Sequence, residues 1–499
     1  MKDDQTGFEG LAAKTVKGSA YSIAASAVTM VLGFGRSVLM ARLLAPEDFG
    51  VVAFALTFLN FTTPLRDFGL DQALIHYKLD EDASLDDVLA VHFSLRSVLI
   101  GLFVLLLLAA IPILRYAYPQ KTMLIPVLLG LTVGEIARGL GATPTAYLQK
   151  EMHFKALIVL QVLTSLSMTI VGPLMAWYGW GVWAIVGERI SGVIVATLFV
   201  WAFIRPWRLR LKFDVEKIKW YLTYGKFIFV THGLERALEE FDDFWIGTSL
   251  GNLALGYYSK SYEFALYPRR IISDPLTKVV FPLFAKLQDN RLQLSKAYFR
   301  FSSLVTRVGF LLGGVLILGA PDFVYLVLGE KWMPMVTTFQ LMILYVLLDP
   351  LAMIGASLVQ AVGHPDFWTR VRVVQVVLFV PAVILGSRLW QINGVALATD
   401  LALLVGLVLL FFQNRRLVDV SLRRLFGFPT LALLVGAGIS WQLSANLVVE
   451  SHLINGILTV LAFVSIYSMI LLLTESRAYT HYARMILRLL TNHAATHGE

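Results

Sequence analysis

The chain has 499 residues, of which 57% are hydrophobic and 15% are charged, whereas a soluble protein of this length would carry about 25% charged residues. It contains no cysteine, which excludes disulfides, thiolate metal sites and cysteine catalysis. The net charge of +8 need not indicate nucleic acid, because membrane proteins concentrate positive charge in cytoplasmic loops. Uncharged runs such as 98–114 recur along the chain, so the composition predicts an all-α membrane protein with many spans.

Apolar segments of suitable length predict about fourteen transmembrane helices. In chain order they cover about residues 18–43, 51–74, 88–114, 122–148, 155–178, 181–204, 218–247, 254–282, 302–327, 335–362, 368–388, 391–413, 426–447 and 453–474. The first 16 residues are polar and have no apolar core, which predicts that there is no cleavable signal peptide. Alternate loops are rich in Lys and Arg, so the positive-inside rule places both termini in the cytoplasm.

The two halves of the chain resemble each other. The turn Leu44–Gly50 has a counterpart in Leu250–Gly256, about 206 residues later, and further matches follow in the same order. These matches predict two pseudo-symmetric six-helix lobes that are related by an axis along the membrane normal and have a cavity between them. The predicted parts are a cytoplasmic segment (1–17), the N-lobe (18–204), a basic linker (205–217), the C-lobe (218–413), a basic loop (414–425), two further helices (426–474) and a cytoplasmic tail (475–499).

Charged residues inside the predicted spans are candidates for function, because a charge within the bilayer is costly unless it faces protein or water. Glu235, Glu239 and Asp242 share one face of the seventh span, and Arg236 lies one turn from Glu239. A helix this polar cannot face lipid, so we expect it to line a water-filled cavity. For any one of these residues the alternative is an internal salt bridge that only satisfies a buried charge.

The cationic and acidic residues of this cavity have different expected roles. Guanidinium groups match phosphate oxygens and an ammonium supplies a point charge, so arginines and Lys260 would bind a phosphate-bearing substrate. The surplus carboxylates could titrate or bind Na⁺, and the candidates for such cation coupling are Glu235, Glu239, Asp242 and Asp349. We expect Arg96 and Arg307 to snorkel toward the cytoplasmic surface. Asp67 and Asp71 are expected to brace the end of a helix.

The sequence contains no catalytic signature. There is no phosphate-binding loop of the Walker type and no spacing typical of metal ligands, so we expect no metal and no cofactor other than a coupling proton or Na⁺. The predicted loops also leave no room for a glycosyltransferase domain. We therefore expect a transporter rather than an enzyme.

The stretch Ala41–Ile75 resembles the N-terminal signature of the polysaccharide (oligosaccharide) flippases, through ARLLAPEDFGVVAFALTF and the later RDFGLDQALI. These flippases form the polysaccharide-transport branch of the multidrug/oligosaccharidyl-lipid/polysaccharide exporter superfamily, and the long form, similar to the colanic acid flippase, has fourteen spans. The resemblance implies two lobes in a V shape and alternating access. It also implies that an undecaprenyl-pyrophosphate-linked oligosaccharide crosses the bacterial inner membrane for exopolysaccharide, O-antigen or capsule synthesis.

In that family, cationic residues of the central cavity are thought to contact the pyrophosphate and the sugars. Matched by position, this role falls on Arg36, Arg138, Arg236, Lys260, Arg269 and Arg270. The implied partners are the lipid-linked oligosaccharide, membrane lipid and the polymerase and chain-length machinery of the same pathway, and no nucleic acid. The alternatives are a multidrug or cation antiporter of the same superfamily, which normally has twelve spans, and a membrane polysaccharide polymerase or ligase, which needs a larger outer loop.

Overall fold

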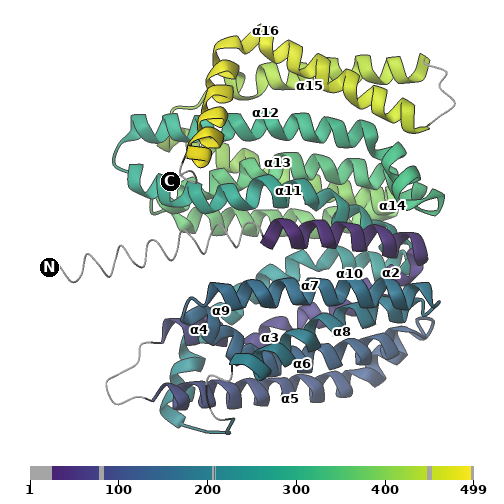
Figure 1. Cartoon of the computed structure of the whole chain (residues 1–499), viewed down its shortest axis with the longest axis vertical. Coiled ribbons are helices and arrows are strands. Elements are labelled where there is room, and N and C mark those ends of the chain that lie inside the picture. Colours follow the sequence, from purple (N-terminus) through teal and green to yellow (C-terminus); the bar gives the residue numbers. More distant parts are fainter. Residues whose placement is uncertain (1–24, 78–83, 205–206, 208, 447–451, 496–499) are drawn as a thin grey trace. The chain divides into compact units, whose positions relative to one another are not determined.

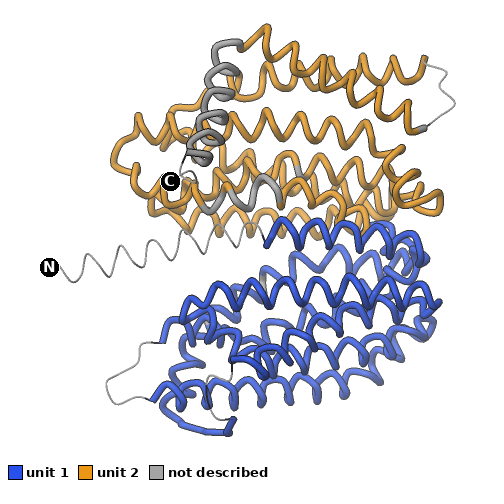
Figure 2. The backbone as a smooth tube through the Cα atoms, viewed as in Figure 1, with its two compact units in different colours: residues 1–259 blue, residues 260–499 orange. Residues whose placement is uncertain are grey.

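The structure, a computed structural model, describes residues 25–77, 84–204, 207, 209–446 and 452–495. Within these ranges every regular element is helical, as Figure 1 shows. The predicted cytoplasmic segment 1–17 and the side chains of the tail beyond Glu475 lie outside what is described. The chain forms two compact units, residues 1–259 and residues 260–499 (Figure 2). The lobes and linkers predicted from the sequence stay predictions.

The first unit begins with the helix Ala25–Leu43. Its further elements are α2 (Pro46–Phe61), α3 (Thr63–Asp67), α4 (Leu70–His76), α5 (Leu85–Ala117), α6 (Leu124–Lys150), α7 (Phe154–Trp177), α8 (Val182–Phe199), the π-helical turn Val200–Ile204, α9 (Val215–Glu239) and α10 (Phe241–Ser249). The predicted span 51–74 is broken, because α3 and α4 are bent by 48° from α2. Phe68 (φ 42°) and Gly69 (φ 67°) are both left-handed and separate α3 from α4.

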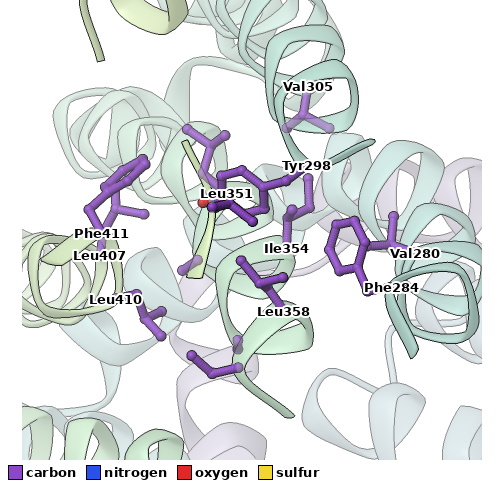
Figure 3. Packing of buried hydrophobic residues seen from close by; sticks show 14 of the residues in the cluster. Val280, Phe284, Tyr298, Val305, Leu351, Ile354, Leu358, Leu407, Leu410 and Phe411 are labelled. Carbon is purple, nitrogen blue, oxygen red and sulfur yellow. The ribbon is translucent and has the colours of Figure 1, made fainter. Parts of the chain in front are cut away.

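α11 (Asn252–Leu287) begins in the first unit and continues into the second. The second unit then contains α12 (Arg291–Phe323), the turns Val324–Leu328 and Glu330–Met335, α13 (Val336–Ala361), α14 (Pro365–Leu417), α15 (Leu422–Asn446) and α16 (His452–Ala495). Its core joins four of these helices: Figure 3 shows Phe284 of α11, Tyr298 of α12, Leu358 of α13 and Leu410 of α14 in one apolar cluster.

α14 is a helical hairpin. Its backbone leaves the helical region at Trp390 and Gln391, and the chain doubles back there. A Cβ added to Gly386 would lie 2.3 Å from the carbonyl oxygen of Gly394, so the two arms touch through their backbones. Farther from the turn, the Gln375 side chain donates a hydrogen bond to the carbonyl of Ala402 on the opposite arm. The hairpin therefore corresponds to the two predicted spans 368–388 and 391–413.

Ten helices among the described residues are long and apolar enough to cross a membrane, or eleven if α2 and α3–α4 form one bent span. The all-helical, many-span fold predicted from the sequence is confirmed, and fourteen is an approximate count. The difference between ten and fourteen has three sources. The predicted span 51–74 is broken, α14 holds two of the predicted spans, and the spans predicted over α9, α10 and α11 do not qualify as apolar helices of sufficient length.

The two C-terminal helices pack on α12. The ring of Phe463 on α16 lies against Gly314 of α12, where an added Cβ would approach it to 2.1 Å. Arg307 of α12 binds Glu475 through two hydrogen bonds of 2.7 and 2.6 Å, at the residue where α16 is kinked. Only 9% of the Arg307 side chain is exposed, so the expectation that it snorkels to the surface is wrong: a buried carboxylate binds it instead.

Candidate functional site

The first candidate cation, Arg36, is held by a carboxylate. Its Nε lies 2.9 Å from Oε1 of Glu188 on α8, and the two side chains are 18% and 12% exposed. Glu188 was not among the predicted site residues, although a carboxylate inside the apolar helix Val182–Phe199 was a signal for it. Arg36 therefore contributes to a largely buried ion pair of the first unit.

Arg138 on α6 belongs to a group of three charged residues. Glu135, one turn earlier, forms an ion pair with the buried Arg66 of α3, and its Oε2 also lies 3.5 Å from Nε of Arg138. Arg66 is further fixed by the hydroxyl of Thr63 at 2.6 Å. The Arg138 side chain, by contrast, is 62% exposed. Two guanidinium groups share one carboxylate, and the exposed member is Arg138.

Some acidic candidates of α9 and α10 form an ion pair or a hydrogen bond, and another is exposed. Arg236 and Glu239 form the ion pair that their spacing predicted, at 2.9 Å, and Glu235 is exposed. Asp242 accepts a hydrogen bond of 2.7 Å from the hydroxyl of Tyr258. The carboxylate of Glu240, which was not a predicted site residue, is buried and accepts a hydrogen bond from Asn60 at 2.9 Å.

The candidates of the second unit differ in exposure. Lys260 is buried and lies 2.7 Å from Oε2 of Glu263, one turn along α11. Arg269 pairs with the buried Asp349 of α13 at 3.1 Å, so a predicted substrate ligand and a predicted coupling carboxylate bind each other. Arg270 is exposed, and its guanidinium lies 5.4 Å from the centre of the Tyr267 ring.

Arg269 also lines a cavity of the second unit. The other lining residues are Pro268, Val305, Gly309, Leu312, Gly313, Leu316, Ile343, Leu347 and Pro350, all without charge. An apolar cavity disfavours a free ionic group, and the paired carboxylate of Asp349 compensates this guanidinium. Arg270, the next residue of α11, is exposed and forms no ion pair with Asp349 in the part of the chain that the structure describes.

A third polar cluster, on α3, α4 and α5, was not predicted as a site. Arg96 binds Asp67 at 3.0 Å and lies 3.6 Å from Asp71, and only 5% of its side chain is exposed. The expectation that Arg96 snorkels to the surface is therefore wrong, because two carboxylates of the neighbouring helices hold it inside. The expectation that Asp67 and Asp71 brace a helix end agrees with these contacts.

The six cations thus fall into two groups. Arg36, Arg236, Lys260 and Arg269 each lie within 3.1 Å of a carboxylate oxygen. Arg138 and Arg270 are exposed, and Arg138 shares the carboxylate of Glu135 with Arg66. Exposed guanidinium groups are suited to binding an anion such as a phosphate.

Comparison with known proteins gives a family and a fold. The model of the family described as polysaccharide biosynthesis protein matches residues 39–337. An uncharacterized membrane protein in the cps region of Klebsiella pneumoniae is 27% identical over 76% of this chain and 77% of its own length. The lipopolysaccharide biosynthesis protein WzxC of Escherichia coli is 24% identical over 80% of each chain. The succinoglycan biosynthesis transport protein ExoT of Rhizobium meliloti is 27% identical over 64% of each.

Two solved structures show the same fold. The lipid II flippase MurJ, in an inward closed conformation, superposes with a TM-score of 0.72, 16% identity and coverage of 92% of this chain and 99% of its own. A multidrug resistance transporter of the MATE family, in an inward-facing conformation, gives a TM-score of 0.57 at 16% identity, with coverage of 80% and 94%. At these identities the likeness concerns the fold alone.

Proposed function

We propose that this chain, which belongs to the family of polysaccharide biosynthesis proteins, moves an undecaprenyl-pyrophosphate-linked oligosaccharide across the bacterial inner membrane. The chain is a multi-pass membrane protein, and relatives are named for lipopolysaccharide biosynthesis and for succinoglycan transport. The chain acts as a transporter, and no bond of the cargo is made or broken.

The observation that carries the proposal is the exposure of Arg138 and Arg270. Both side chains are accessible, whereas the other four candidate cations each have a carboxylate partner. A pyrophosphate presents anionic oxygens, and one guanidinium group can bind two such oxygens through parallel hydrogen bonds. The four paired cations, Arg36, Arg236, Lys260 and Arg269, become available to a substrate only if their carboxylates release them. When they are released, these four side chains form secondary contacts with the sugars.

The lobes alternate between access to the two sides, and both termini stay in the cytoplasm. The coupling ion, a proton or Na⁺, binds at one of the candidate carboxylates Glu235, Glu239, Asp242 and Asp349. In support, Glu235 is exposed and Asp242 is held only by neutral donors among its described hydrogen bonds. The oligosaccharide is then passed to the polymerase and chain-length machinery of the same pathway.

The test is a flipping assay in proteoliposomes that contain an undecaprenyl-pyrophosphate-linked oligosaccharide. An external glycosidase digests only the outward-facing cargo, so the rate of complete digestion reports flipping. The double variant Arg138→Gln/Arg270→Gln removes both exposed guanidinium groups and should slow flipping by about tenfold or more, since each loses a charge-assisted contact. The matched control is Arg370→Gln, an exposed arginine paired with Asp366 one turn away on α14. An unchanged flipping rate in the double variant would show that Arg138 and Arg270 do not bind the pyrophosphate.

A second candidate function is export of organic cations. The acids of α9 and α10 favour it, because Glu235, Glu239, Glu240, Asp242 and Asp243 lie within nine residues. In this case the same proteoliposomes would expel a fluorescent lipophilic cation in exchange for protons. The variant Glu235→Gln/Asp242→Asn would abolish this exchange, while the arginine double variant would leave it intact. Cation efflux without any flipping of the oligosaccharide would show that the chain is a cation antiporter and not a flippase.

A further inference from the structure

The corner between α14 and α15 carries four arginines within ten residues. Arg415 and Arg416 lie in the last turn of α14, and Arg423 and Arg424 lie in the first turn of α15. All four side chains are exposed, and none of them forms an ion pair in the part of the chain that the structure describes. We call these four residues the corner cluster.

Basic residues before and in the first turn of α9, in the first unit, have acidic partners. Arg210 and Lys212 both bind Asp87 of α5. Lys217 lies 2.6 Å from Oδ2 of Asp214. An excess of basic residues in the loops is common to membrane proteins, but here the two regions differ. Acids compensate the cations in the first unit, and the described residues provide no acid for the corner cluster.

The α14–α15 corner is fixed on the neighbouring turn between α11 and α12. The backbone N–H of Asp419 donates a hydrogen bond of 2.9 Å to the hydroxyl oxygen of Ser295, and the carboxylate of Asp419 accepts one of 2.8 Å from Arg291. Val418 and Leu425 are buried in the apolar core of the second unit. The backbone that carries the corner cluster is therefore held in place before a ligand binds, which lowers the entropic cost of binding.

The contact between these two corners widens the basic surface. Segments 286–300 and 415–424 together contain eight basic and two acidic residues. Lys286, Lys296 and Arg300, which belong to the first of these segments, are exposed. A surface with such a surplus of positive charge attracts anions that are spread over an area.

The corner cluster also lies at the ends of two membrane-spanning helices. The apolar spans Pro365–Leu417 and Leu422–Asn446 meet at the corner, so the four guanidinium groups lie within a few residues of the apolar region. Phe412 and Phe428, each about one helical turn farther into a span, are exposed as well. Cations at the end of a span, next to exposed apolar side chains, match a phospholipid, whose charged headgroup adjoins its acyl chains.

We propose that the corner cluster binds the phosphate headgroups of anionic phospholipids in the surrounding bilayer. The guanidinium groups contact the phosphate oxygens, and Phe412 and Phe428 contact the acyl chains. A layer of headgroups fits a basic surface that extends over two corners better than one compact pyrophosphate does. The inference does not depend on the proposed function, because lipid binding can be measured without cargo.

Native mass spectrometry of the purified chain in detergent counts the phospholipids that stay bound. The natural chain should bind phosphatidylglycerol at least about fivefold more tightly than phosphatidylcholine, because only the former carries a net negative charge. The corner variant, in which Gln replaces all four arginines of the corner cluster, should lose this preference. The matched control removes four exposed cations at other helix ends and should keep the preference. Its changes are Arg115→Gln, Lys155→Gln, Lys219→Gln and Arg388→Gln.

Thermal unfolding provides a second measurement in case the corner variant fails to fold. Phosphatidylglycerol should raise the unfolding temperature of the natural chain more than phosphatidylcholine does, since a ligand of the folded state stabilises that state. The half variants Arg415→Gln/Arg416→Gln and Arg423→Gln/Arg424→Gln should each lose part of this difference. The difference should also shrink as the salt concentration is raised from about 0.05 M to about 0.5 M, because exposed charges are then screened.

Two results would overturn the inference. The first is equal binding of the two phospholipids by the natural chain, or a preference for phosphatidylglycerol that the corner variant retains. The second is stronger binding of undecaprenyl phosphate than of phosphatidylglycerol, lost in the corner variant, which would assign the corner cluster to the cargo. If the natural chain prefers phosphatidylglycerol through the corner cluster but flips no oligosaccharide, the proposed function fails and the phospholipid site stands.

Discussion

Gly50 and Gly256 contact each other where α2 crosses the first turn of α11. A Cβ on Gly50 would lie 1.7 Å from the carbonyl oxygen of Asn252, and a Cβ on Gly256 would lie 1.9 Å from that of Pro46. In each case the carbonyl belongs to the residue four positions before the other glycine. The contact is therefore reciprocal, as in a two-fold symmetric interface, and the internal repeat predicted from the sequence would relate its two sides.

This contact predicts a large cost for any side chain at either glycine. Gly50→Ala and Gly256→Ala force backbone against backbone, which cannot be relieved by a rotamer change, and should each destabilise the chain by about 1–3 kcal/mol. Gly101→Ala on α5, where nothing lies within 4 Å, is the matched control and should be neutral or stabilising.

Thermal unfolding of the purified variants in detergent measures these effects. The double variant should cost less than the sum of the single variants, since one separation of the two helices relieves both clashes. Strict additivity, or a Gly50→Ala variant as stable as Gly101→Ala, would contradict the reciprocal contact.

Sequence patterns predicted this relationship only in part. The repeat of Leu44–Gly50 in Leu250–Gly256 indicated that the two turns are equivalent, but not that they touch. Apolar runs predicted the helices well, and the boundary between spans 368–388 and 391–413 agrees with the break at Trp390 and Gln391. The interruption between α3 and α4 at Phe68 escaped prediction, because the left-handed residue lies against Gly225 of α9, a contact between segments far apart in the sequence.

For the candidate site, too, the sequence predicted contacts within one helix but not contacts between helices. The Arg236–Glu239 pair could be predicted because it depends only on the spacing along one helix. The partner of Arg36 is Glu188, and the partner of Arg269 is Asp349, so these pairs join helices that are far apart in the sequence. Which cations remain exposed is decided by those partners, and local pattern carries no information about them.

The pair of Arg307 and Glu475 predicts how the C-terminal helices are attached. Their side chains are 9% and 11% exposed, so removal of one partner leaves an uncompensated buried charge. Arg307→Met or Glu475→Gln should each destabilise the chain by about 3–5 kcal/mol, while the double variant recovers much of this loss. The exposed pair of Arg370 and Asp366 should contribute at most about 1 kcal/mol in the same double-mutant cycle. Equal coupling in the two cycles would contradict the anchoring role.

Lys121 predicts a pH dependence of stability. It lies in the loop between α5 and α6, where its Nζ donates to Asn252 at 2.6 Å and lies 4.7 Å from the centre of the Phe54 ring. Burial lowers the pKa of the Lys121 ammonium below its ordinary value. The unfolded chain then binds more protons than the folded chain between the two pKa values, so stability rises with pH in that window.

The variant Lys121→Met lacks this titration, so the unfolding temperature of the natural chain should rise relative to the variant as the pH is raised from about 8 to about 10. Taking the difference between the unfolding temperatures of the two proteins cancels the contribution of the other groups that titrate in this pH range. A difference that stays constant with pH would show that the burial of Lys121 has no effect on its protonation.

Variants of Glu135 and Arg138 can distinguish a structural role of Arg138 from a role in binding the cargo. Its partner Arg66 is buried and also contacts Thr63, so Glu135→Gln removes the carboxylate from a desolvated guanidinium and should destabilise the chain by about 3–5 kcal/mol. Arg138 is exposed, and an exposed pair contributes at most about 1 kcal/mol. Arg138→Gln should therefore keep the unfolding temperature and lose flipping, whereas Arg138→Lys should keep part of the flipping because the point charge remains. If Arg138→Gln unfolds as readily as Glu135→Gln, Arg138 braces the helices and the phosphate contact must be sought at Arg270.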